Sequence, residues 1–276
     1  MKTRKLIAVQ ASRPTSDGDG VKIRRVAGFQ DGRMDPFLML DELKADNTKD
    51  YVGGFPPHPH RGIETLTYML KGHFRHEDHL GNVGELKDGG AQWMSAGRGV
   101  IHSEMPIMTD GQLHGFQIWI NLPRAKKMQP ADYRDFQAQS IPTVALQGEG
   151  DFRLISGTLN GEKGPLDQPS VPMLVGDLRA EGEVKLPIPS EFGAVAYLYQ
   201  GAVTLCGQQI EAGHMLYFDQ GDAISLTAVP GTSAGLIVLA GKPIREPVVH
   251  WGPFVMNSMA EIEQAIADYQ NGQLTA

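Results

Sequence analysis

The sequence predicts an all-β protein built as two β-sandwich units in tandem. Its 276 residues include 33 glycines and 18 prolines, which separate many short apolar runs rich in Val, Ile, Leu and aromatic residues. Short apolar runs between turn-forming residues are typical of sandwiches and barrels. A chain of this length suits two domains better than one, and a weak internal repeat indicates the same division.

The expected strands fall into two sets, and helical periodicity is nearly absent from both. The first set comprises residues 22–26, 37–40, 64–70, 92–95 and 116–120. The second set comprises residues 152–155, 170–178, 194–199, 215–218 and 234–239.

The internal repeat relates one strand and the glycines that follow it in each half. Residues 67–72 (TYMLKG) resemble residues 196–201 (AYLYQG). A second glycine follows each strand, Gly89 in the first half and Gly213 in the second, and an aromatic strand comes next. Two similar β units in tandem account for both the length and the composition.

We therefore expect an N-terminal domain over residues 1–130 and a C-terminal domain over residues 131–276, joined by a proline-containing connector. The C-terminal domain would end in an amphipathic helix at about residues 258–271. Ser258 and Glu261 form a capping box at its start. Apolar residues then recur every three or four positions, so we expect the helix to pack across a sandwich.

Charge and cysteine content exclude several classes of function. The formal net charge of −7 disfavours direct binding of nucleic-acid phosphates. Cys206 is the only cysteine, so no internal disulfide or multi-thiolate zinc site is expected. No stretch approaches the ~20 apolar residues of a membrane helix. These features favour a cytoplasmic protein that does not enter a membrane.

Two histidines lie two residues apart in the segment 55–62 (FPPHPHRG). On an extended backbone, the side chains of His58 and His60 point to the same face. Pro59 between them stiffens the chain and restricts the segment to a sheet edge or a strand entry. A stiff pair of imidazoles with a shared direction is suited to binding a metal ion.

His102 and Glu104 repeat this spacing in the segment 97–104 (GRGVIHSE). If the two segments lie side by side, three imidazoles and one carboxylate converge. Such ligands suit Fe(II), Mn(II), Ni(II), Cu(II) or Zn(II). Four protein ligands would leave two positions of an octahedral ion open for water, O2 or a chelating substrate.

Other residues near these segments are candidates for the ligand set or the pocket. Glu64 lies four residues after His60, so on a continuous strand its side chain would point to the same face as the two histidines. This alternation does not decide whether Glu64 or Glu104 is the carboxylate ligand. Arg61 could orient one of these carboxylates. Gln117 and Trp119 share a strand face and could line a pocket or fill the sandwich.

A second histidine cluster, formed by His73, His76 and His79 with Glu77 and Asp78, precedes a Gly-Asn turn. We interpret it as a solvated polar hairpin rather than a second metal site.

The second β unit contains no comparable ligand set. The repeat places Pro187 and Pro189 at the positions of the first histidine pair, and Leu226 and Ala228 at the positions of His102 and Glu104. We therefore expect the second unit to be structural.

The segments that surround these candidate ligands resemble the pirin family of the cupin superfamily. The resemblance is carried by residues 37–41 (FLMLD), 55–65 (FPPHPHRGIET), 93–99 (WMSAGRG), 101–104 (IHSE) and 117–123 (QIWINLP). It implies a bicupin, in which two jelly-roll-like sandwiches face each other and the N-terminal one binds the metal. It also implies a ligand set of His58, His60, His102 and Glu104, which favours Glu104 over Glu64. The implied metal is Fe(II), with Zn, Ni, Mn and Cu as alternatives.

The resemblance implies two alternative functions. One is a quercetin 2,3-dioxygenase, which acts on a small aromatic flavonol with O2 and uses Glu104 as both ligand and catalytic base. The other is a non-catalytic, redox-sensing regulator that binds a protein partner. A purely structural metal fits less well, because structural sites tend to be closed. We expect a monomer, since a bicupin pairs its sandwiches within one chain.

Overall fold

The structure is a computed structural model that describes residues 2–29, 32–108 and 111–276. Met1, Gln30, Asp31, Thr109 and Asp110 lie outside the described residues. The chain divides into two compact units. The unit that we call the first sandwich comprises Pro14–Gln30, Phe37–Gln139 and Ile244–Ala276. The unit that we call the second sandwich comprises Met1–Arg13, Asp31–Pro36 and Ser140–Pro243.

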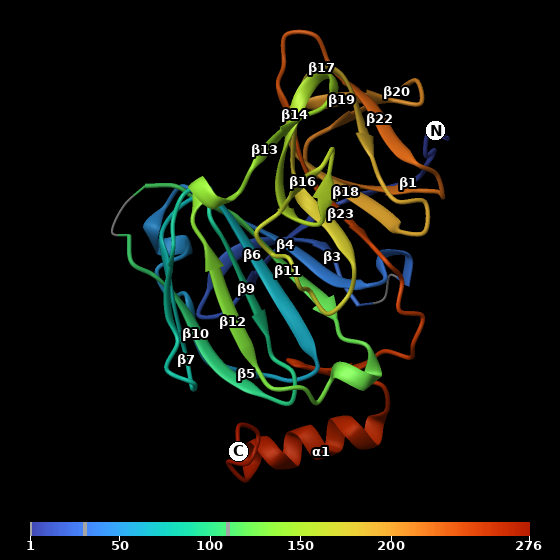
Figure 1. Cartoon of the computed structure of the whole chain (residues 1–276). Coiled ribbons are helices and arrows are strands. Elements are labelled where there is room, and N and C mark those ends of the chain that lie inside the picture. Colours follow the sequence, from blue (N-terminus) through green and yellow to red (C-terminus); the bar gives the residue numbers. More distant parts are fainter. Residues whose placement is uncertain (1, 30–31, 109–110) are drawn as a thin grey trace. The chain divides into compact units, whose positions relative to one another are not determined.

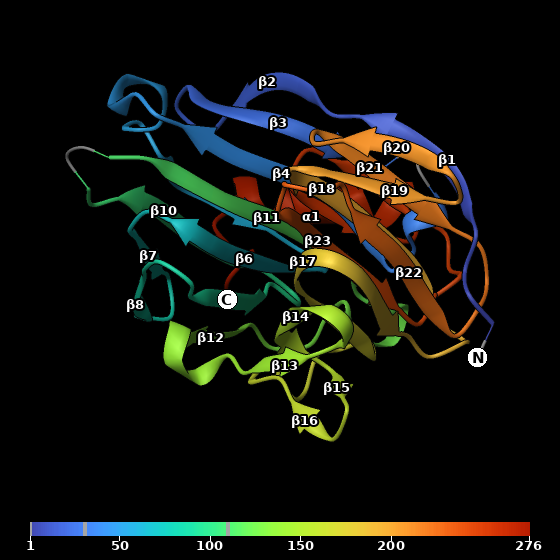
Figure 2. The same cartoon turned by 90° about the horizontal axis from the view of Figure 1, so that it is seen from above.

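The first sandwich contains two main sheets among its described residues. A seven-stranded sheet has the order β12-β9-β6-β11-β4-β3-β2. Its strands are β2 (Arg13–Asp17), β3 (Val21–Ala27), β4 (Phe37–Ala45), β6 (Ile63–Lys71), β9 (Ala91–Ser95), β11 (Leu113–Asn121) and β12 (Asp132–Phe136). A four-stranded sheet has the order β5-β10-β7-β8, and Figure 2 shows β10, β7 and β8 beside one another. Its strands are β5 (Phe55–His60), β7 (Phe74–Asp78), β8 (Val83–Leu86) and β10 (Val100–Pro106).

The second sandwich is built from one sheet in which ten described strands take part. Its strands are β1 (Leu6–Ala11), β13 (Thr143–Ala145), β14 (Gln147–Ser156), β17 (Met173–Pro187), β18 (Gly193–Gln200), β19 (Ala202–Leu205), β20 (Gln208–Glu211), β21 (His214–Phe218), β22 (Ala223–Ala228) and β23 (Ala234–Gly241). A small hairpin pairs β15 (Thr158–Leu159) with β16 (Glu162–Lys163). Alternate residues of these strands, such as Leu174, Leu178, Leu236 and Val238, form one apolar core.

The expected all-β architecture with a C-terminal helix is confirmed. Nine of the ten expected strands lie within observed strands, and the tenth is shifted because β17 begins at Met173 and continues to Pro187. Strands β7 and β8 were not among the expected strands, because they are short and contain few apolar residues.

The internal repeat corresponds to the same hydrogen bond in both sandwiches. The amide of Gly89 donates to the carbonyl of Met69, and the amide of Gly213 donates to the carbonyl of Leu198, each at 2.7 Å. Both glycines adopt positive φ, 75° and 91°, which a residue with a Cβ rarely adopts. The repeated glycines therefore mark one turn that both sandwiches share.

The C-terminal helix α1 (Met259–Gln270) belongs to the first sandwich, together with the hairpin of β24 (Val249–Trp251) and β25 (Phe254–Met256). Ser258 caps the helix as expected, by accepting a hydrogen bond from the Glu261 amide. One apolar cluster joins the helix to the hairpin and the chain end, and its buried members are Phe254, Met256, Ile262, Ala265 and Leu274. No helix among the described residues is long and apolar enough to cross a membrane.

This arrangement differs from the expected division at residue 130. The segment Ile244–Ala276 and strand β12 lie in the first sandwich, whereas β1 lies in the second sandwich. The periodicity of a helix shows that it has an apolar face but does not identify what that face packs against. Here the partners are the residues around β25 and the half-buried Ile101 of β10.

Lys127 ties the C-terminal segment to the body of the first sandwich. Its side chain is 1% exposed, and its ammonium donates to Gly62 O at 2.9 Å, Asn121 Oδ1 at 2.8 Å and Val255 O at 2.9 Å. A buried ammonium is costly unless its donors are satisfied, and these three acceptors match its three hydrogens.

Replacing Lys127 by methionine should therefore destabilise the protein. Lys127→Met leaves three buried oxygens without this donor, so we expect urea unfolding to show a loss of about 2–4 kcal/mol. Lys126→Met, at an exposed position in the same turn, should change stability by less than about 0.5 kcal/mol. Equal stability of the two variants would contradict a bridging role for Lys127.

Candidate metal centre

The pairing of β5 with β10 brings the two histidine segments together. The strands are antiparallel, and His102 lies directly opposite His58, so their side chains share a face with that of His60. The ring centroids are 4.4 Å apart for His58 and His102, 4.8 Å for His58 and His60, and 5.1 Å for His60 and His102. One ring nitrogen from each of the three lies within 4.8 Å of the others.

Backbone carbonyls determine which ring nitrogen of His58 and of His60 is available to bind a metal. The Nδ1 atom of His58 lies 2.8 Å from Pro56 O, and that of His60 lies 3.4 Å from Pro253 O. A carbonyl oxygen can only accept a hydrogen bond, so each Nδ1 carries the hydrogen and each Nε2 presents a lone pair. Histidine ligands of metals usually have such a partner on the other nitrogen.

Burial keeps these imidazoles neutral. It lowers the pKa of His60 to about 3, with a further contribution from His58, and it lowers the pKa of His102 well below its ordinary value. Burial also lowers the pKa of His58. A neutral imidazole has the lone pair that a metal requires, and the Nε2 atom of His102 is buried with no hydrogen-bond partner among the described residues.

Glu104 follows His102 on β10, across an irregularity in the pairing with β5. Its Oε1 atom accepts hydrogen bonds from Gln92 Nε2 and from Thr67 Oγ1. Burial nevertheless raises the pKa of Glu104 to about 7, and these two hydrogen bonds act in the opposite direction. The carboxyl group therefore changes charge near neutral pH in the metal-free protein.

Glu104 belongs to a second set of candidate ligands, which it forms with His102 and His76 within 4.8 Å of one another. The two sets share His102. The interpretation of His76 as part of a solvated hairpin was wrong, because His76 is 1% exposed and lies opposite Glu104 in the pairing of β7 with β10. The alternation of Phe74, His76 and Asp78 along β7 was the available signal for an inward-facing histidine.

Glu64 faces away from the histidines. It lies on β6, three residues before Thr67, which contacts Glu104 from the opposite face of the same strand. The parity argument was wrong because the chain turns at Gly62, where φ is 82°, and enters a different sheet.

Arg61 also has a different role from the expected one. Its side chain is 4% exposed, donates to Asp268 Oδ2 of α1 at 2.6 Å and donates to the carbonyl of Arg98. Arg61 thus holds the C-terminal helix against the first sandwich.

A cavity of about 620 Å³ lies against His58, His60 and Glu104. Gln117 and Trp119 are among the residues that line it. Its volume is in the range of small-molecule sites. All of its lining residues belong to the first sandwich.

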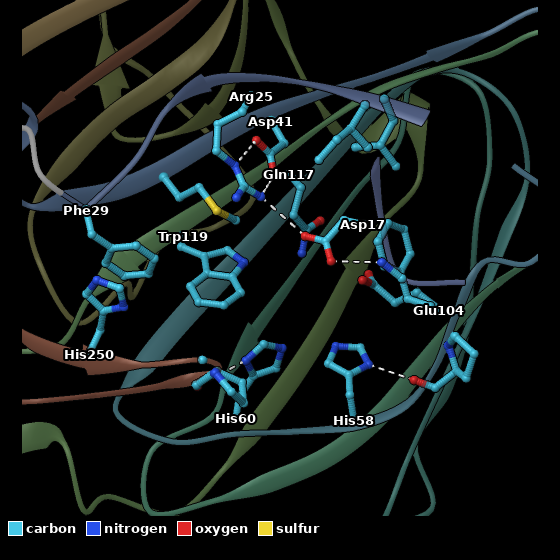
Figure 3. Close-up of a pocket in the computed structure, with 18 residues that line it drawn as sticks. Asp17, Arg25, Phe29, Asp41, His58, His60, Glu104, Gln117, Trp119 and His250 are labelled. Atoms are coloured by element: carbon cyan, nitrogen blue, oxygen red, sulfur yellow. Dashed lines mark hydrogen bonds and ion pairs between the residues drawn. The ribbon is translucent and has the colours of Figure 1, made fainter. Parts of the chain in front are cut away.

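One part of the cavity wall is aromatic. The ring of Phe29 stacks on His250 with centroids 4.0 Å apart and meets Trp119 edge-on at 5.7 Å. Trp119 in turn meets His60 edge-on at 4.9 Å. Figure 3 shows this aromatic group beside the histidines. Sequence reasoning did not identify Phe29 or His250, which come from distant parts of the chain.

The wall across from His58 and His60 is charged (Figure 3). Arg25 donates to both carboxylate oxygens of Asp41, at 2.9 and 2.7 Å, and to Asp17 at 3.3 Å. Burial raises the pKa of Asp41, and Arg25 opposes that change. The cavity thus has aromatic, charged and imidazole-bearing walls.

These residues fit a divalent transition metal. Three neutral imidazoles and a nearby carboxylate are the donors that Fe(II), Mn(II), Ni(II), Cu(II) and Zn(II) share. The buried and unpartnered Nε2 of His102 is an atom that a bound cation would satisfy.

A β-sandwich that holds a histidine-rich candidate metal site beside a cavity of small-molecule size is typical of cupin proteins. The chain matches the family model described as Pirin over residues 20–120 and the one described as Pirin C-terminal cupin domain over residues 173–275. It belongs to the pirin family, with two cupin β-sandwich domains.

Named relatives cover the chain almost completely. A Vibrio cholerae protein named "Putative quercetin 2,3-dioxygenase" is 56% identical over 98% of both chains. A Pseudomonas aeruginosa protein of the same name is 43% identical, also over 98% of both. A crystal structure of a quercetin 2,3-dioxygenase from Acinetobacter baumannii superimposes with a TM-score of 0.90 at 30% identity and covers 99% of both chains.

The raised pKa of Glu104 predicts a pH dependence of stability in the metal-free protein. The native carboxyl stays protonated up to about pH 7, whereas an unfolded glutamate ionises near pH 4.3. At this group the unfolded state therefore binds fewer protons between these values, so the contribution of Glu104 to the free energy of unfolding should fall by about 3 kcal/mol as the pH rises through them. The buried histidines act in the opposite direction, because their native pKa values are lowered. Urea unfolding of the wild type and of Glu104→Gln at about pH 5 and about pH 8 isolates the contribution of Glu104 as the difference between the two proteins.

Glu104→Gln is the matched control, because glutamine does not ionise and keeps the same size. Between about pH 5 and about pH 8, Glu104→Gln should gain about 2–3 kcal/mol of stability relative to the wild type, because the histidine contributions are common to both proteins. An unchanged pH dependence would show that Glu104 ionises normally in the native state.

Proposed function

We propose that this protein is a metal-dependent dioxygenase that opens a flavonol such as quercetin with O2. The observation that carries the proposal is the group of three neutral imidazoles, two of them buried, of which His58 and His60 line a small-molecule cavity together with Glu104. The names of the Vibrio cholerae and Pseudomonas aeruginosa relatives support the same substrate class.

His58, His60 and His102 would hold the metal through their Nε2 atoms, and Glu104 would complete the set. Iron(II) is the metal that we propose, and the same donors would also accept Zn, Ni, Mn or Cu. When bound, the metal would supply a Lewis acid for the substrate oxygens and an electron donor for O2. The carbonyls of Pro56 and Pro253 would keep two of these imidazoles oriented.

Glu104 would take the proton of the flavonol hydroxyl. Gln92 and Thr67 both donate to Oε1 of its carboxylate, so Oε2 is the atom that would accept the proton. Burial raises the pKa of Glu104 in the metal-free site, and a bound cation would lower it again, so that the carboxylate would be ionised and able to accept the proton. Gln92 and Thr67 would hold the carboxylate in place during the transfer.

The cavity walls suit a polyhydroxylated aromatic molecule. Phe29, Trp119 and His250 offer ring faces and edges to the aromatic system. Asp17 and Arg25 offer an acceptor and a donor to hydroxyl groups at the far end. A planar flavonol could therefore place one oxygen-bearing edge at the imidazoles and another at the charged wall.

The first test combines metal content with turnover. Protein purified without chelator should contain about one iron per chain, and it should consume quercetin in air, as followed by the loss of quercetin absorbance. Glu104→Gln should lower kcat by about 10²–10⁴-fold, and His58→Ala should lower metal content. Iron without turnover would instead favour the redox-sensing regulator and a search for its protein partner.

A second test concerns the aromatic wall. Trp119→Leu should raise KM for quercetin by about tenfold and change kcat much less, because the ring contacts the substrate away from the reacting atoms. Trp251→Leu is the control, because Trp251 is 64% exposed in the hairpin whose His250 lines the cavity. Equal kinetic effects in the two variants would argue against the proposed substrate position.

A further inference from the structure

His76 and Asp78 lie behind the candidate ligands, on the strand that flanks β10. In the pairing of β7 with β10, Asp78 lies opposite His102 and His76 lies opposite Glu104. The side chains of His76 and Asp78 are each 1% exposed. Neither residue lines the cavity, so substrate binding does not explain why two polar groups are buried there.

A chain of contacts connects these residues to His102. The Nε2 atom of His76 lies 3.4 Å from Asp78 Oδ2, and the Nδ1 atom of His76 lies 3.4 Å from Nδ1 of His102. The order is therefore Asp78, then His76, then His102, whose Nε2 atom is buried with no hydrogen-bond partner among the described residues.

The carboxylate of Asp78 determines the direction of these hydrogen bonds. An ionised carboxylate only accepts, so Nε2 of His76 carries the hydrogen. In a neutral His76 the Nδ1 atom then has the lone pair and accepts from Nδ1–H of His102. His102 must therefore present its lone pair at Nε2, which is the form that a metal ligand requires.

Asp78 is itself held rigidly by the turn between β7 and β8. Its Oδ1 atom accepts from the amides of Leu80 at 2.9 Å and Asn82 at 3.0 Å. Its Oδ2 atom also accepts from Asn82 Nδ2 at 2.8 Å. These donors stabilise a buried carboxylate and fix the oxygen that faces His76.

Tyr133 holds the ring plane of His76. The two rings are stacked with centroids 4.0 Å apart and an interplanar angle of 12°. Gly84 lies opposite His76 in the pairing of β7 with β8 and leaves room for the Tyr133 ring. A Cβ at this position would come within 1.9 Å of the Tyr133 hydroxyl. Tyr133 thus holds the face of the His76 ring, while Asp78 and His102 contact its two nitrogens.

We propose that Asp78 and His76 are positioning residues that hold His102 in the tautomer and orientation that present Nε2 to the metal. This inference rests on the proposed metal centre. Through the chain, the negative charge of Asp78 also makes His102 a stronger donor, which favours the more highly charged oxidation state of a bound iron.

The alternative is that His76 is itself a ligand, since it lies within 4.8 Å of His102 and Glu104. Its two ring nitrogens already face Asp78 and His102. A ligand role would need the ring to break one of these contacts.

Three variants test the series of contacts from Asp78 through His76 to His102. His76→Leu removes both hydrogen bonds, His76→Asn keeps an acceptor where Nδ1 lies, and Asp78→Asn removes the charge. Asp135→Asn is the control, because Asp135 is an exposed carboxylate that acts on His76 through its charge, whereas Asp78 acts through its charge and a hydrogen bond. The readouts are zinc affinity by competition with a chelating dye, the Fe(III)/Fe(II) midpoint potential, and the number of imidazoles at iron by X-ray absorption.

We expect His76→Leu to weaken zinc binding by about 10–100-fold while three imidazoles remain at the iron. His76→Asn should recover most of that loss. Asp78→Asn should raise the midpoint potential, and a tenfold change in the ratio of Fe(III) to Fe(II) affinity corresponds to about 59 mV. Asp135→Asn should match the wild type. If His76→Leu does not fold, His76→Asn and Asp78→Asn still decide the question.

Two results would overturn the inference while leaving the metal centre intact. One is wild-type affinity and potential in both His76→Leu and Asp78→Asn. The other is the loss of one imidazole from the iron in His76→Leu, which would make His76 a ligand. A wild-type protein that binds no metal would instead overturn the proposed function, and this inference with it.

Discussion

The antiparallel pairing of β5 with β10 is the constraint on which the rest of the site depends. It places His102 opposite His58 and brings His60 into the same group. Pro59 can occupy β5 because that strand is the edge of its sheet, where a missing amide costs no ladder hydrogen bond. A shift of one residue in this register would turn one histidine segment to the opposite face, and no group of three imidazoles would remain.

Burying so many titratable groups has a cost that is visible in their pKa values. Burial drives His60 and His102 toward the neutral form and holds a proton on Glu104 up to about pH 7. The metal-free centre therefore avoids uncompensated charge by remaining neutral. A bound cation would reverse this balance, because it favours the ionised carboxylate and satisfies the imidazole lone pairs. Burial thus leaves neutral imidazole lone pairs and a carboxyl group that readily loses its proton, and both favour binding of a cation.

Local patterns in the sequence account for much of the fold and for most of the candidate site. Short apolar runs and the repeated glycines predicted the strands and the tandem arrangement, and the i, i+2 histidines predicted a shared face. The patterns failed where the outcome depends on a partner far away in the chain. Glu64 has the expected spacing, but the turn at Gly62 carries it into another sheet. His76 lies in a polar segment, yet its pairing with β10 and its stack on Tyr133 bury it.

The sequence by itself determined the all-β class, the capped C-terminal helix, and the two segments that carry His58, His60, His102 and Glu104. These features follow from periodicity, capping and turn chemistry, which act over a few residues. Only the tertiary structure decided that the helix packs on the first sandwich, which face Glu64 occupies, and which residues stand behind His102. The physical reason is that strand pairing and core packing join segments tens to hundreds of residues apart, and neither the register nor the partner is encoded in the local pattern.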